Sequence, residues 1–223
     1  MAVSRDKKHN GGRVLFIGDS ITEQWSRFRP HFFPDHGFIN RGLGGQTTRD
    51  IRARFVQEVR GAEPEAVHIL GGINDIAGNG GPIEVAETQD SIGWMMARAA
   101  EHGCRVLVAS LTPAAIVVWN RSVEPLPKIA AINEWLRAEA VAQDATFLDY
   151  HEVLRAPSGG LRPGLGPDGL HLNAKGYRLI EPVLLAAVAA AVGTAGFRPP
   201  SLAERARRLV PRRIRAITGQ SRR

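Results

Sequence analysis

Short apolar runs alternate with helical patterns along most of this chain, and this alternation constrains its fold more than any other feature. The apolar runs, which predict strands, are residues 13–17, 38–40, 66–70, 105–109 and 146–148. Apolar side chains spaced along one helix face predict helices at residues 48–60, 82–101, 127–142 and 173–192. The alternation predicts an α/β fold with a five-stranded, mostly parallel sheet and helices on both of its faces.

The composition fits a soluble globular domain and argues against several other classes. Hydrophobic residues make up 43% of the 223 residues, which is enough apolar material for a buried core. Cys104 is the only cysteine, so a disulfide framework is excluded. We find neither an apolar run of membrane-spanning length nor a start typical of a secretory signal, and we therefore expect a cytoplasmic protein.

The positive charge is concentrated at one end of the chain. Nine of the 29 basic residues but only one of the 22 acidic residues lie in residues 198–223, so this segment carries +8 and residues 1–197 carry −1. We therefore expect one domain over residues 1–197 and an arginine-rich C-terminal tail over residues 198–223. The tail could contact an anionic membrane or nucleic acid, or it could be a solvated extension.

In parallel sheets, ligands bind at the carboxyl ends of the strands, so the segments that follow each predicted strand are the places to look for a site. Gly18-Asp19-Ser20 follows the first strand. A serine at a helix start is favoured for nucleophilic chemistry, because the helix amides stabilise negative charge there. The alternative is that Asp19 or Ser20 only caps the helix.

Glycine-rich segments follow the second and third strands. Gly44-Gly45-Gln46 could present backbone N–H groups to a ligand, or it could be a turn before the next helix. The segment lacks the glycine pattern of a dinucleotide site and the Gly-Lys-Ser/Thr of a phosphate loop. Asn74, in Gly71-Gly72-Ile73-Asn74, could donate its side-chain amide to an oxyanion, or it could form an Asx turn.

Asp168 and His171 follow the fifth strand and are three residues apart. A carboxylate at this distance can accept a hydrogen bond from one ring nitrogen and leave the other nitrogen as a base. The alternative is a solvated loop that happens to contain a histidine. Taken together, four strand ends would supply a nucleophile, hydrogen-bond donors and a base to one cleft.

With these motifs in this order, residues 13–192 resemble the SGNH (GDSL) hydrolase family. The resemblance implies a flavodoxin-like, three-layer α/β/α sandwich over the domain at residues 1–197, and chemistry that needs no metal or organic cofactor. The site residues that it implies are Ser20 as nucleophile and first oxyanion donor, Gly45 (backbone N–H) and Asn74 (side-chain amide) as further donors, His171 as base and Asp168 as its orienting carboxylate.

Details of the motifs bear on the branch of the family. Gly78-Asn79, shortly after Asn74-Asp75, look most like the bacterial lysophospholipase-like or acetylhydrolase-like esterases. The chain departs from the common family pattern at Leu172, where proline is frequent, and at Gln46, where aspartate is frequent. These departures bear on the preferred substrate more than on the proton transfers.

The sequence therefore predicts a serine esterase that hydrolyses short-chain acyl esters, with acetyl esters foremost, through an acyl-enzyme intermediate. One alternative is a lysophospholipase or thioesterase of the same family. Another is a catalytically idle ligand-binding protein with an anion-binding tail. The expected partner is a small acyl ester, and Asp19, Gln46 and Trp119 are candidates for contacting it. The sequence does not indicate an oligomeric state.

Overall fold

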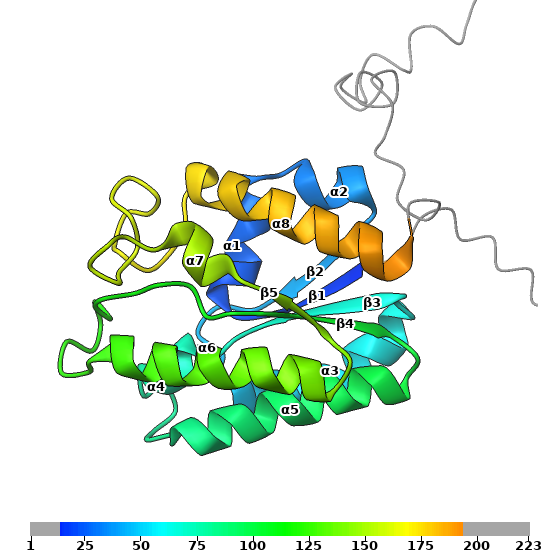
Figure 1. The fold of residues 1–223 in the computed structure, drawn as a ribbon, viewed down its shortest axis with the longest axis horizontal. Helices are drawn as coiled ribbons and strands as arrows, with labels where there is room; N and C mark the ends of the chain where they lie inside the picture. The colour runs from blue at the N-terminus through cyan, green and yellow to red at the C-terminus, as the bar shows by residue number, and fades with distance from the viewer. Residues whose placement is uncertain (1–13, 194–223) are drawn as a thin grey trace, which may run out of the picture.

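A five-stranded sheet forms the middle layer of the protein (Figure 1), which the computed structural model describes over residues 14–193. The strands lie in the order β2-β1-β3-β4-β5, and every neighbouring pair is parallel. All five carboxyl ends therefore meet at one edge, as predicted. The strands are β1 (Val14–Gly18), β2 (Ile39–Gly42), β3 (Ala66–Leu70), β4 (Arg105–Ala109) and β5 (Thr146–Leu148).

Helices cover both faces of the sheet, which confirms the predicted three-layer sandwich (Figure 1). One face carries α1 (Ser20–Phe28), α2 (Phe32–His36), α7 (Tyr150–Leu154) and α8 (Ala174–Val192). The other face carries α3 (Thr48–Ala62), α4 (Ile73–Ile76), α5 (Val85–Glu101) and α6 (Pro125–Ala142).

The structure differs from the sequence-based expectation at several boundaries. The short helices α2, α4 and α7 were not expected, because four or five residues are too few to show a helical period. Strand β2 extends to Gly42, beyond the predicted 38–40. Helix α5 begins at Val85 and not at residue 82, because the backbone of Glu84 is still extended. Helix α6 begins at Pro125, where proline suits the first turn.

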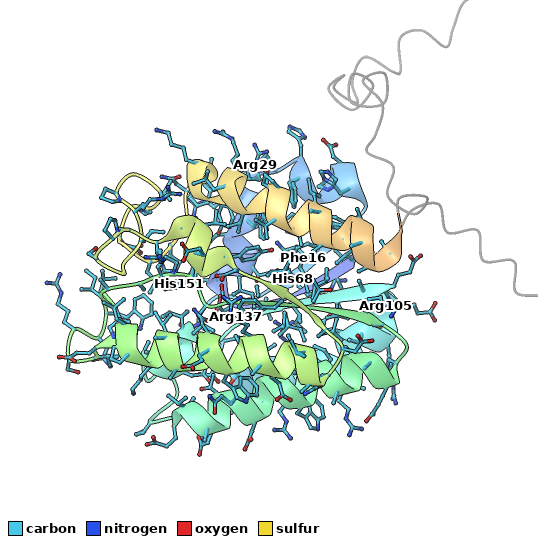
Figure 2. The ribbon with its side chains drawn as sticks, in the orientation of Figure 1. Phe16, Arg29, His68, Arg105, Arg137 and His151 are labelled. Carbon is cyan, nitrogen blue, oxygen red and sulfur yellow. The ribbon has the colours of Figure 1, made fainter. Side chains whose placement is uncertain are left out.

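The core between the sheet and the α1–α8 layer is rich in aromatic side chains, and Figure 2 shows Phe16 and His68 within it. The His68 ring stacks on Phe16 with 4.6 Å between centroids, and its Nε2 lies 3.1 Å from the Tyr150 hydroxyl. Complete burial lowers the pKa of His68 to about 3, so this imidazole is a neutral core side chain.

Two side chains of α8, Glu181 and Tyr177, join this helix to α1. The Glu181 carboxylate accepts hydrogen bonds from Arg29 Nε at 2.7 Å and Nη2 at 2.8 Å, and from Trp25 Nε1 at 3.3 Å. The Tyr177 hydroxyl donates to the Ile21 carbonyl at 2.7 Å. These contacts hold α1 along its length, from Ile21 near its start to Arg29 at its end, against the helix that follows His171.

Within residues 14–193, the helices are all too short or too polar to cross a lipid bilayer. The predicted arginine-rich tail at residues 198–223 lies outside the described residues.

Candidate active site

Helix α1 begins directly after β1, and this places Ser20 at the carboxyl edge of the sheet. The preceding residue, Asp19, is the N-cap, because its Oδ1 accepts the backbone N–H of Ile21 at 2.9 Å. Of the two capping alternatives left open by the sequence, the structure therefore assigns the cap to Asp19. The Ser20 hydroxyl takes no part in the cap and makes a different contact.

Ser20 Oγ lies 3.0 Å from His171 Nε2, although 151 positions separate the two residues. The other ring nitrogen, Nδ1, lies 2.7 Å from Asp168 Oδ2. Since a carboxylate only accepts, Nδ1 carries the proton and Nε2 presents its lone pair to the serine hydroxyl. The structure thus brings Ser20, His171 and Asp168 into one hydrogen-bonded chain.

Asp168 is held in its ionised form. Burial alone would raise the pKa of Asp168. Hydrogen bonds from the His171 ring and from the backbone N–H groups of His171 and Leu170 have the larger combined effect, so the pKa of Asp168 is lowered. These backbone bonds are 2.8 Å and 3.0 Å long, and both reach Oδ1. The ionised carboxylate can stabilise an imidazolium when His171 accepts a proton.

Asn74 and the loop at residues 44–46 lie on the neighbouring strand ends. Asn74 is buried, and its Nδ2 donates to the Gln46 carbonyl at 2.9 Å. Gly45 has a φ of 77°, a conformation that favours glycine. The loop passes close to the serine, because a Cβ added to Gly44 would lie 3.7 Å from Ser20 Cβ. The glycine loop therefore passes Ser20 at Gly44 and contacts the predicted amide donor at Gln46.

Trp119 lies next to the candidate base. Its ring centroid is 6.1 Å from that of His171, with 33° between the two planes, and the residue is 46% exposed. Its indole N–H donates to Asn79 Oδ1 at 3.0 Å. Of the predicted substrate contacts, Trp119 is therefore the one with a large surface open to solvent beside the site.

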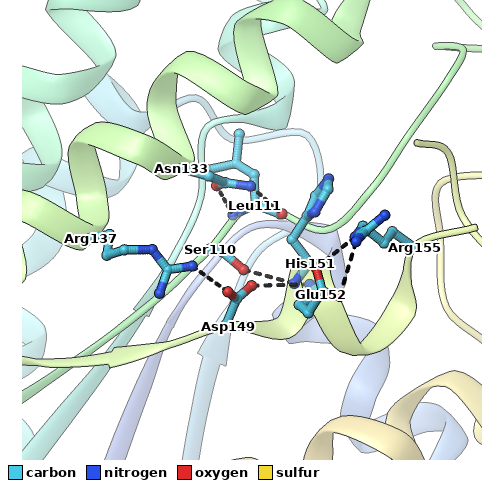
Figure 3. A network of polar contacts seen from close by, with 8 residues as sticks. All are labelled: Ser110, Leu111, Asn133, Arg137, Asp149, His151, Glu152 and Arg155. Atoms are coloured by element: carbon cyan, nitrogen blue, oxygen red, sulfur yellow. Dashed lines mark hydrogen bonds and ion pairs between the residues drawn. The ribbon is translucent and has the colours of Figure 1, made fainter. Parts of the chain in front are cut away.

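A polar network at the ends of β4 and β5 anchors the loop that carries Trp119 (Figure 3). Asn133 on α6 accepts from the Leu111 backbone N–H at 2.7 Å and donates to its carbonyl at 3.1 Å. Ser110 Oγ accepts the His151 backbone N–H at 2.8 Å, and this bond ties β4 to α7. The loop therefore leaves the sheet from a fixed point.

Asp19 and Gln46, which were also predicted to contact substrate, have partners within the protein. Asp19 is 1% exposed. Burial raises the pKa of Asp19 to about 7, and the hydrogen bond from the Ile21 backbone N–H opposes this shift. Gln46 Oε1 accepts from Arg54 Nε at 2.8 Å. Their substrate contacts stay predictions.

Asp75, next to Asn74, has a structural role at the same edge. Its carboxylate accepts the backbone N–H of Thr48 at 2.9 Å and also the Thr48 hydroxyl, and the Thr88 hydroxyl lies 3.3 Å away. Burial raises the pKa of Asp75, and these hydrogen bonds oppose the shift. The contacts tie the β3 loop to the starts of α3 and α5, and so they support the position of Asn74.

Two residues of this site were not predicted from the sequence. Asn79 donates to Asn74 and to the Gly45 carbonyl, and Arg54 Nη2 donates to the Gly18 carbonyl at 3.2 Å. The signal for Asn79 was the Gly78-Asn79 pair shortly after Asn74, which resembles one branch of the family but assigns no role to the Asn79 side chain. Across residues 14–193, no three His, Cys, Asp or Glu side chains are grouped as a metal site would require.

Comparisons with known proteins bear on the family and the fold of this chain. Residues 16–179 match the model of the GDSL-like lipase/acylhydrolase family. A crystal structure of a GDSL-like lipase from Bacteroides thetaiotaomicron VPI-5482 superposes with a TM-score of 0.78 and 34% identity, over 81% of this chain and 89% of that chain. The uncharacterized lipoprotein YqeF of Bacillus subtilis (strain 168) is 30% identical over 64% of this chain and 69% of that protein.

An acetylxylan esterase of Geobacillus stearothermophilus is 33% identical over a shorter stretch, which is 30% of this chain and 41% of that enzyme. This chain thus matches about two fifths of the esterase's length. The family match covers most of the α/β/α domain and includes Ser20, Asn74 and His171. The chain belongs to the GDSL-like lipase/acylhydrolase family of carboxylic ester hydrolases, and it has the SGNH hydrolase fold.

Proposed function

We propose that this protein is a serine esterase that removes short acyl groups, foremost acetyl, from larger alcohols. The observation that carries the proposal is the hydrogen-bonded chain from Ser20 Oγ through His171 to Asp168, with spacings of 3.0 Å and 2.7 Å. A ligand-binding protein without catalysis would have no need for all three groups in this order.

The reaction proceeds in two halves. His171 Nε2 takes the Ser20 proton as the hydroxyl oxygen attacks the ester carbonyl, and Asp168 stabilises the imidazolium that forms. The tetrahedral oxyanion accepts hydrogen bonds from the backbone N–H groups of Ser20 and Gly45 and from the Asn74 amide. His171 then gives its proton to the departing alcohol. Water, deprotonated by the same nitrogen, releases the acid from Ser20.

The surroundings of His171 support a large leaving alcohol. The alcohol must depart next to the nitrogen that protonates it, and Trp119 lies beside this ring with 46% of its surface exposed. Its indole offers an apolar platform, such as one face of a sugar ring could cover. The similarity to an acetylxylan esterase supports the same class, an O-acetylated carbohydrate.

The test is hydrolysis of p-nitrophenyl esters from acetate to decanoate, with acetylated xylan as a polymeric substrate. We expect kcat/KM to be highest for acetate, acetate to be released from the xylan, and Ser20→Ala to abolish both reactions. A rate that rises toward decanoate would favour the lysophospholipase or thioesterase alternative. Rates in wild type and Ser20→Ala that both equal the uncatalysed rate would favour the idle ligand-binding alternative.

A further inference from the structure

One side-chain amide, that of Asn79, joins three parts of the proposed site. Its Nδ2 donates to Asn74 Oδ1 at 2.9 Å and to the Gly45 carbonyl at 3.3 Å. Its Oδ1 accepts from Trp119 Nε1 at 3.0 Å. The backbone N–H of Asn79 also donates to the Asn74 carbonyl at 2.9 Å. The two asparagines are therefore bonded through both main chain and side chain.

The chemistry of these groups fixes the direction of each amide. An indole N–H only donates, so Asn79 presents its oxygen to Trp119 and its NH₂ group to Asn74. Because Asn74 receives this donor at its oxygen, its own NH₂ group is directed the other way, where one N–H meets the Gln46 carbonyl at 2.9 Å. The proposed function assigns the second N–H of Asn74 to the substrate oxygen.

We propose that Asn79 is a positioning residue that orients the Asn74 amide toward the developing oxyanion and, through the Gly45 carbonyl, restrains the residue whose backbone N–H is the neighbouring donor. The inference rests on the proposed function, in which these two groups stabilise that oxyanion. Asn79 itself does not touch the reacting atoms and acts through its two partners. Since oriented donors matter most in the transition state, loss of Asn79 lowers kcat more than it raises KM.

The test compares Asn79→Leu, Asn74→Ala and the double variant with p-nitrophenyl acetate as substrate. Leucine is close to asparagine in size but has no hydrogen-bonding group and adds no charge. Deleting one oxyanion donor costs about 10²–10³ in kcat, so we expect misorientation in Asn79→Leu to cost about 10-fold to 100-fold, with KM changed less than about threefold.

Asn120→Leu is the matched control. Asn120 follows Trp119 directly, but its side chain binds the Ala77 carbonyl at 2.8 Å and the Ser122 hydroxyl at 2.7 Å. We expect this variant to keep kcat within about twofold of wild type, because these side-chain bonds reach neither Asn74 nor Gly45. A loss in Asn120→Leu as large as that in Asn79→Leu would overturn the proposal.

The double variant decides whether Asn79 acts through Asn74. We expect its loss in kcat to be smaller than the product of the two single losses by at least about fivefold, because residues that act as a unit are not additive. Fully multiplied losses, or wild-type kcat in Asn79→Leu, would overturn the proposal. If Asn79→Leu does not fold, Asn79→Ala takes its place in the same cycle. Full activity in Asn74→Ala would instead overturn the proposed oxyanion site.

Discussion

Asp168 binds His171 through both of its carboxylate oxygens. Oδ2 lies 2.7 Å from ring Nδ1, and Oδ1 lies 2.8 Å from the backbone N of the same residue. One carboxylate therefore holds both the ring and the main chain of the candidate base. The separation of three positions in sequence makes this double contact possible within a single turn.

The double contact predicts the effect of Asp168→Asn. The asparagine oxygen can still accept the backbone N–H, but its NH₂ group cannot accept from Nδ1, so the ring would take the wrong tautomer. We expect kcat for p-nitrophenyl acetate to fall about 10³-fold to 10⁴-fold with little change in the thermal unfolding midpoint. A loss below about tenfold would show that Asp168 does not orient the base.

Asn74→Ala tests the predicted oxyanion donor. We expect kcat to fall about 10²-fold to 10³-fold while KM changes little, because the lost bond forms in the transition state. Asn173→Ala is a control with the same chemical change at the N-cap of α8, where Asn173 Oδ1 accepts two backbone N–H groups. The control should lose about 1 kcal/mol of unfolding free energy and keep its kcat. Equal kcat values for Asn74→Ala and wild type would exclude this role.

Asp19→Asn should change how stability depends on pH. Burial raises the pKa of Asp19 to about 7, so the native state keeps a proton that the unfolded state loses near pH 4. The contribution of Asp19 is therefore fully present below pH 4 and is lost as the pH rises through 7. Asparagine keeps the helix cap without titrating.

The measurement for Asp19 is urea unfolding of wild type and Asp19→Asn between pH 4 and pH 8. We expect the variant to gain stability relative to wild type as the pH rises, by up to roughly 4 kcal/mol over this range. Parallel stability curves for the two proteins would show that Asp19 keeps an ordinary pKa.

The buried imidazole of His68 predicts that stability depends on pH with the opposite sign. Burial lowers its pKa to about 3, so the unfolded state takes up a proton below about pH 6.5 that the native state excludes. The contribution of His68 is present above pH 6.5 and is lost as the pH falls toward 3. Replacing both His68 and its partner Tyr150 by phenylalanine removes the titration and leaves neither polar group unpaired.

The double variant His68→Phe/Tyr150→Phe should therefore resist acid better than wild type. We expect its unfolding free energy, relative to wild type, to rise by up to roughly 4 kcal/mol between pH 7 and pH 3.5. Tyr150→Phe alone is the control, since it keeps the imidazole. If the difference in unfolding free energy between the double variant and wild type does not depend on pH, this would contradict the neutral state of His68.

The sequence predicted those parts of the fold and the site that depend on local pattern. The five strands follow from apolar runs, and Asp168 reaches His171 because the two are three positions apart. Ser20 and Asn74 were predicted because each follows a strand of a parallel sheet, and parallel order brings strand ends together.

The unpredicted parts depend on contacts between distant segments. The role of Asn79 requires Trp119, which lies 40 positions away on a loop whose path the sequence does not specify. The role of Asp75 also depends on a distant segment, because its partner Thr48 lies 27 positions away along the chain. A short helix such as α4 is stabilised by its surroundings and not by a period of its own.

The bonds between α1 and α8 have a consequence for how this protein could diversify. Glu181 and Tyr177 join the helix that begins at Ser20 to the helix that follows His171, so the distance between hydroxyl and imidazole is set on one side of the sheet. The loop that carries Trp119 is anchored separately, by Asn133. Mutations in that loop can therefore accumulate and change which alcohols are accepted, while the spacing that the chemistry needs is inherited unchanged.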